Sequence, residues 1–210
     1  MSRLFVAAGA AIFASTMAVA AVDGGDHDLR GGTGTQLLAG GEICVPCHTP
    51  HNATAARASG PLWNHDRQNT AAFTPYSSTN LADTATVAGA SLACLGCHDG
   101  VTGLDAWGGN TAAPNTELGG TASEDGIGTS GGNTIVGVNL SNDHPIGMTY
   151  ATVQGHADRI GEFKALLATS PYLSNGKVEC GSCHDPHSGT ANFLRSTNAA
   201  SALCLKCHNK

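Results

Sequence analysis

The hydrophobic and polar positions of this chain predict few regular elements. Near the start, residues 4–14 form an unbroken apolar run. Much later, residues 158–169 place apolar side chains at the spacing of one helix face, which is typical of an amphipathic helix. These side chains are Ile160, Phe163, Leu166 and Leu167. We expect this stripe to pack in the core and assign no chemistry to it.

All eight cysteines fall in four copies of one motif, CxxCH, at residues 44–48, 94–98, 180–184 and 204–208. Cysteines three residues apart on a helical turn point the same way. Both sulfurs can therefore form thioethers with one porphyrin edge, and the next residue can ligate the iron. The motif indicates c-type haem attachment. Zinc sites and disulfide frameworks also use paired cysteines, but neither needs a histidine after every pair.

The motif therefore predicts four covalent c-type haems and most of their ligands. The thioether cysteines are Cys44, Cys47, Cys94, Cys97, Cys180, Cys183, Cys204 and Cys207. The proximal iron ligands are His48, His98, His184 and His208.

The composition favours a core completed by cofactor. The chain is 41% hydrophobic but only 5% aromatic and 12% charged, and it holds 28 glycines. A chain so poor in large side chains is a weak candidate for an ordinary packed core. We expect a mostly irregular fold with a few short α-helices at the attachment sites and little or no β-sheet. We also expect that it does not form without haem.

The first 20 residues have the form of a secretory signal, with a basic start, an apolar run and a small-residue cleavage site at residues 18–20. The alternative is an uncleaved anchor, because residues 4–22 are long enough to span a membrane. Ser15, Thr16 and the many alanines make that stretch weakly apolar, which favours cleavage. We expect an exported chain without a membrane span when mature, at the cell surface or outside it, with the periplasm as the alternative.

The formal net charge of −6 argues against nucleic acid and anionic lipid surfaces as partners. The sequence also shows no phosphate-binding loop, no hydrolytic constellation and no nucleophile with a base beside it. We therefore do not expect an enzyme.

The four motifs alternate in type. The first and third continue as CHxPH, whereas the second and fourth follow SLACLGCH and SALCLKCH, which suggest short helices. The chain therefore looks like two copies of a di-haem unit, at residues 21–107 and 138–210, joined by a Gly-rich insert at 108–137 and packed as one haem-cored domain.

The distal iron ligands are expected to be histidines. Met148 is the only methionine past the signal, so at least three of the four cannot be Met. The repeat selects one upstream histidine and one tail histidine in each half, namely His27, His51, His144 and His187. His65 is held in reserve, and His156 is interpreted as a surface or packed side chain.

Two axial histidines leave an iron no open position for substrate, which favours electron transfer over catalysis. The order of motifs suggests that His187 reaches back to the haem at His98. The same step gives His51 no recipient within its own chain. We therefore expect His51 to ligate the haem at His208 of a preceding copy, in a head-to-tail homopolymer. His27 and His144 would serve the haems at His48 and His184.

Taken in order, CHTPHN, PLWNH, SLACLGCHDG, NDHPIG, VECGSCHDPH, NFLR and CLKCHNK resemble the multihaem c-type cytochromes of the doubled CxxCH group. Within it the chain is similar to the OmcE-like extracellular tetrahaem cytochromes that form conducting filaments. The resemblance implies stacked bis-His haems, few regular elements and one axial histidine donated across the subunit boundary. It also implies electron transfer to redox proteins or extracellular metal acceptors. A soluble periplasmic tetrahaem shuttle and a multihaem reductase with one five-coordinate haem are the alternatives.

Overall fold

The computed structural model describes residues 22–30, 41–51, 53, 62–66, 73–110, 135–159 and 161–209. Within them the chain is mostly coil, and strand pairing is limited to isolated bridges. The regular elements are the α-helices α2 (Ser91–His98), α3 (Tyr150–Gln154) and α4 (Cys180–Cys183) and the 3-10 turns η4 (Ala157–Arg159), η5 (Ala191–Phe193), η6 (Ala199–Ser201) and η7 (Cys204–Lys206). The predicted fold class is confirmed.

Two expected segments fall largely outside this part of the chain. The predicted signal, residues 1–20, lies entirely outside the described residues, as do residues 111–134 of the predicted Gly-rich insert. In the described residues, every helix is too short or too polar to cross a membrane.

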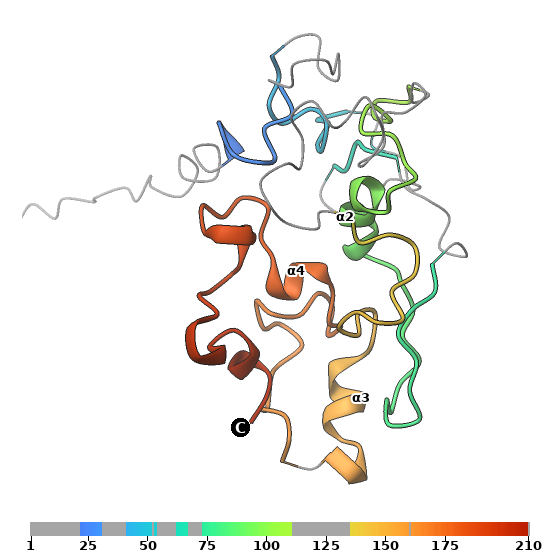
Figure 1. Ribbon diagram of the computed structural model, residues 1–210, viewed down its shortest axis with the longest axis vertical. Coiled ribbons are helices and arrows are strands. Elements are labelled where there is room, and N and C mark those ends of the chain that lie inside the picture. The colour runs from blue at the N-terminus through green and yellow to red at the C-terminus, as the bar shows by residue number, and fades with distance from the viewer. Residues whose placement is uncertain are drawn as a thin grey trace, which may run out of the picture.

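The three α-helices follow one another along the long axis of the molecule, with α2, α4 and α3 in that order (Figure 1). Helix α2 belongs to the first half of the sequence and contacts α4 of the second half. The backbones of the two halves also pair directly, because the Thr74 amide donates to the Val138 carbonyl at 2.9 Å and the Leu140 amide donates to the Thr74 carbonyl at 2.8 Å. The two predicted di-haem units therefore pack directly against each other.

Two small apolar clusters lie in the core of the described residues. The first surrounds α2 and contains Phe73, Val87, Leu92, Leu95 and Leu140. The second surrounds α3 and contains Met148, Tyr150, Val153 and Val178. Met148 is thus a core side chain, only 5% exposed.

One close approach of the two halves requires glycine. Gly147 has a φ of +77°, which only glycine adopts without strain. A Cβ at this position would lie 2.1 Å from the Thr86 carbonyl oxygen. The backbones of the two halves can therefore touch here only because position 147 has no side chain.

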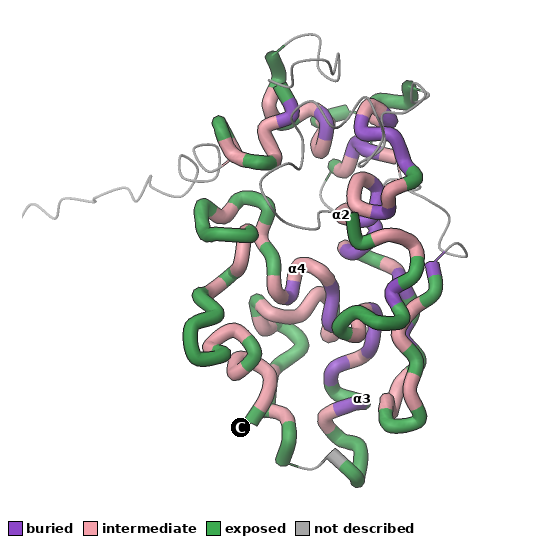
Figure 2. The backbone as a smooth tube through the Cα atoms, in the orientation of Figure 1, coloured by how far each residue is buried: buried purple, intermediate pink, exposed green. Residues whose placement is uncertain are grey.

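The chain after α4 has little protein around it. No residue from 183 to 209 is buried, and the exposed surface of this segment is plain beside the buried α2 and α3 regions (Figure 2). The segment carries the fourth motif and the tail of the third. This exposure agrees with the expectation that cofactor supplies part of the core.

The predicted helical stripe at 158–169 is only partly realised. Helix-like backbone ends with η4, and Gly161 then adopts a φ of +84°, which interrupts any helix. The Lys164 amide donates to the Cys207 carbonyl at 2.8 Å instead of to its own segment. Phe163 and Leu166 still pack against the second cluster, but Leu167 is 77% exposed. Ile160 lies outside the described residues.

Candidate functional site

Each CxxCH motif folds as one helical turn. In the first, third and fourth motifs the amide of the histidine donates to the carbonyl of the first cysteine, at 2.8, 3.1 and 2.9 Å. The second motif forms the last turn of α2. Because residues three apart share a helix face, these turns direct both cysteines of each motif to the same side. This is the arrangement that two thioether bonds to one porphyrin require.

The four turns follow one another in space as they do in sequence. Burial raises the pKa of the Cys97 thiol, and nearby Cys47 of the first motif raises it further. The thiols of Cys94 and Cys180 lie close enough to raise the pKa of the first and lower that of the second, which places the second motif beside the third. Burial also raises the pKa of the Cys183 thiol, and both cysteines of the fourth motif lie close enough to interact with it. The attachment points therefore form an unbroken series.

Three histidines that follow CxxC face a second histidine ring. The ring centroids lie 6.1 Å apart for His48 and His187, 6.2 Å for His98 and His27, and 6.4 Å for His208 and His144. The interplanar angles are 17°, 86° and 77° in the same order.

These separations fit an iron held between two imidazoles. A histidine nitrogen binds a metal at about 2 Å, and the ring centre lies roughly 1 Å beyond that nitrogen. Two rings on opposite faces of one metal should therefore have centroids about 6 Å apart. Direct contact between stacked rings would bring them closer. The three pairs thus leave room for the iron of a haem, and the residues present fit that group.

The ring partners differ from those suggested by the order of motifs. His187 lies opposite His48 and not His98, and His27 lies opposite His98 and not His48. The cause is the packing of the segment after α4, because the Phe193 ring contacts the His27 ring at 4.3 Å, with the two planes tilted by 35°, and holds it beside the second motif. Similarly, His144 lies opposite His208 and not His184.

The surroundings of His27 favour its neutral imidazole. Burial, together with the smaller effect of nearby His98, lowers the pKa of His27 to about 4. Iron coordination requires the neutral imidazole, so this shift favours the ligating form. The Nδ1 atom of His27 is buried without a hydrogen-bond partner in the part of the chain that the structure describes.

Aromatic side chains support two of the proximal rings. Trp63 meets His48 edge to face at 5.6 Å, and Phe163 lies 4.9 Å from His208. The backbone bridges of the same two pairs keep these rings in place. Sequence reasoning did not assign a site role to either aromatic residue. The motif PLWNH placed Trp63 near a histidine, but no sequence signal pairs residue 63 with residue 48.

Among the described residues, neither His184 nor His51 lies opposite a second histidine ring. The Nδ1 of exposed His184 lies 2.9 Å from the carbonyl oxygen of Asn192, and no second histidine ring faces it among the described residues. His51 is also exposed. The Thr49 hydroxyl donates to the His51 carbonyl at 2.5 Å and lies 3.4 Å from the His51 amide.

His65, the reserve distal candidate, is held by backbone groups. It is only 1% exposed. Its Nδ1 lies 2.7 Å from the Asp66 carbonyl oxygen and its Nε2 lies 3.2 Å from the Leu104 carbonyl oxygen. In this arrangement both ring nitrogens are occupied. His156, by contrast, is an exposed side chain 3.8 Å from the Asp158 carboxylate.

A buried polar contact joins the second and third motifs. The Ser91 hydroxyl at the start of α2 donates to the Glu179 carboxylate and accepts the Cys180 amide at 3.0 Å. Glu179 is only 3% exposed, and burial raises its pKa. Glu179 and Ser182 also form a reciprocal capping box at the start of α4. We call Ser91 and Glu179 the junction pair, because they fix α2 against α4.

The comparisons with known proteins agree with the motif analysis. Residues 173–210, which contain the third and fourth motifs, match the family described as Doubled CXXCH motif. No curated protein matches the chain. The CXXCH motifs indicate covalently bound c-type haem, and the family match supports a multihaem c-type cytochrome that functions in electron transfer.

Proposed function

We propose that this chain is an exported electron-transfer subunit with four c-type haems, and that copies join head to tail into an extracellular filament. When bound, each haem supplies a one-electron iron couple. The chain supplies the spacing, because its four attachment turns form one continuous series. The observation that carries the electron-transfer function is the set of three opposed histidine pairs, which would fill both axial positions of their irons.

The surroundings of His184 and His51 support assembly of several copies. In the part of the chain that the structure describes, no second histidine ring lies opposite His184 or the exposed His51. If His51 of a second copy ligated the haem iron at His184, both histidines would have a partner. Contacts of this heterologous kind build open filaments. The sequence suggested the haem at His208 as the one that His51 ligates, and this stays a prediction. Because His144 already lies opposite His208, we favour the haem at His184 instead.

The experiment is His51→Ala in otherwise intact holoprotein, with His156→Ala as the matched control for loss of an exposed histidine. We expect His51→Ala to keep four haems, to lose the bis-His spectrum of one of them and to form short fibres or none in electron micrographs. His156→Ala should behave as wild type. Normal fibres with four unaltered bis-His haems in His51→Ala would refute the assembly proposal.

Two outcomes would favour the alternatives. A monodisperse wild-type protein at high concentration would indicate a soluble shuttle. Carbon monoxide binding to assembled, reduced protein would indicate an open iron and hence a reductase.

A further inference from the structure

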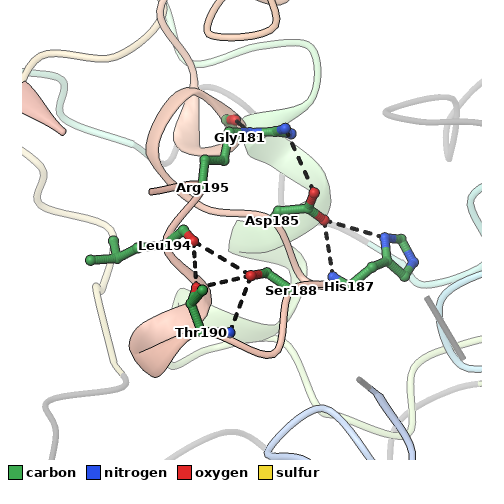
Figure 3. A network of polar contacts seen from close by, with 7 residues as sticks. All are labelled: Gly181, Asp185, His187, Ser188, Thr190, Leu194 and Arg195. Atoms are coloured by element: carbon green, nitrogen blue, oxygen red, sulfur yellow. Dashed lines mark hydrogen bonds and ion pairs between the residues drawn. The ribbon is translucent and has the colours of Figure 1, made fainter. Parts of the chain in front are cut away.

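The tail of the third motif holds a carboxylate against a candidate iron ligand. One carboxylate oxygen of Asp185 accepts the backbone amide of His187 at 3.0 Å and lies 3.5 Å from its ring Nδ1 (Figure 3). The other oxygen lies 3.6 Å from the guanidinium of Arg195. Arg195 is itself held, because its Nε donates to the Gly181 carbonyl. Asp185 therefore sits in a defined position between a cation and the imidazole.

This contact orients the ring for coordination. A histidine that meets an acceptor at Nδ1 carries its proton there and presents Nε2 to a metal. The same ring is the one that lies 6.1 Å from His48 and within 17° of parallel. A carboxylate at Nδ1 also makes the imidazole a stronger donor to the metal, as in other carboxylate–histidine–metal arrangements.

Two other candidate ligands have neutral partners at Nδ1. The Nδ1 of His184 faces the Asn192 carbonyl at 2.9 Å, and that of His144 faces the Pro145 carbonyl at 3.1 Å. The first motif has Thr49 where the third has Asp185. Among the described residues, the Thr49 hydroxyl meets the backbone of His51 and not its ring. The charged contact thus distinguishes His187 from its counterpart in the repeat.

We propose that Asp185 is a positioning residue that sets the midpoint potential of the haem attached at Cys44 and Cys47, by holding His187 and increasing its electron donation. The inference rests on the proposed electron-transfer function. A stronger, more negative axial donor stabilises the oxidised iron, so this haem is held at a lower potential than it would have with a neutral partner at His187.

The test is Asp185→Asn, because an asparagine side-chain oxygen can still accept the His187 amide while the charge is lost. Asp158→Asn is the matched control, since Asp158 is an aspartate beside Nδ1 of His156, which faces no motif histidine in the pairs above. Spectroelectrochemistry should show one of four midpoint potentials shifted upward in Asp185→Asn and none shifted in Asp158→Asn. Nuclear magnetic resonance of the oxidised protein, with the haem identified through its contacts to Trp63, should assign the shift to the His48 site.

A second measurement separates ligand tuning from structural damage. The electron paramagnetic resonance g values of that one low-spin haem should change, while haem count and thermal stability remain those of wild type. Asp185→Glu, which keeps the charge, should restore part of the potential. If Asp185→Asn binds four low-spin haems with four unchanged potentials, the inference is wrong although the proposed function stands. If the wild type lacks bis-His haems, the proposed function fails instead.

Discussion

The imidazole rings of His48 and His187 lie 6.1 Å apart and within 17° of parallel, although they belong to opposite halves of the repeat. On the proposed function, the third motif would supply the second axial ligand of the haem at the first. The two predicted di-haem units are not independent, because one iron site would be built from both.

This relationship predicts that His187→Ala acts within a single molecule. The variant should keep four haems by intact mass, because its thioether cysteines are unchanged. One haem should become high-spin in the absorption spectrum, even in dilute monomer. This separates it from His51→Ala, whose effect should appear only when copies assemble. A dilute His187→Ala protein with four low-spin haems would contradict the pairing.

The junction pair predicts a loss of order between the second and third haems. Glu179→Ala removes the acceptor of the Ser91 hydroxyl and the cap of α4. We expect a loss of about 1 to 3 kcal/mol in the free energy of unfolding, because the buried hydroxyl loses its partner. The Soret circular dichroism, which reports the relative placement of haems, should also change. Glu42→Ala, which alters an exposed carboxylate before the first motif, is the control and should change neither quantity.

Glycine is required inside the second motif but not inside the third. A Cβ at Gly96 would lie 2.5 Å from the Asp66 carbonyl oxygen and 3.2 Å from His65 Nδ1. Gly96→Ala should therefore cost about 1 to 3 kcal/mol through overpacking. A Cβ at Gly181 of α4 meets nothing within 4 Å, so Gly181→Ala should be neutral or slightly stabilising. Thermal denaturation of the two holoproteins tests this difference, and equal melting temperatures would contradict it.

Tyr150 predicts an alkaline limit to stability. Its single hydroxyl proton is shared between the carbonyls of Lys164 at 2.8 Å and Cys207 at 2.9 Å. Tyr150→Phe should cost only about 1 kcal/mol, because other amides still donate to both carbonyls.

Burial raises the pKa of Tyr150 from 10.0 to about 12. The folded chain therefore binds the phenol proton more tightly than the unfolded chain does. Its contribution is full below pH 10 and is lost as the pH rises to 12. Denaturant titrations between about pH 8 and pH 12 should show this loss of unfolding free energy in wild type and a smaller loss in Tyr150→Phe.

The exposure of residues 183–209 predicts that the fold depends on haem. None of these residues is buried by protein, so apoprotein made without attachment machinery should lack the packing that orders them. We expect no cooperative thermal transition in the apoprotein by circular dichroism. A sharp transition would show that the side chains alone build the core.

The motif spacing was sufficient to predict the attachment turns and the irregular fold, because both follow from local geometry and composition. It was not sufficient to predict which rings oppose each other. That pairing depends on how residues 184–194 fold back onto His27 and His48, which local sequence does not encode. The contact between Ser91 and Glu179 likewise joins residues 88 positions apart. The predicted helix at 158–169 does not continue past Gly161, because the following segment forms backbone hydrogen bonds with the fourth motif instead of within a helix.

The most direct test of the account is a haem-resolved cryo-microscopy structure of the assembled holoprotein. We predict iron between His48 and His187, between His98 and His27, and between His208 and His144. The iron at His184 should carry His51 of a neighbouring copy. A different second ligand, or none, at any of the first three irons would contradict the central claim.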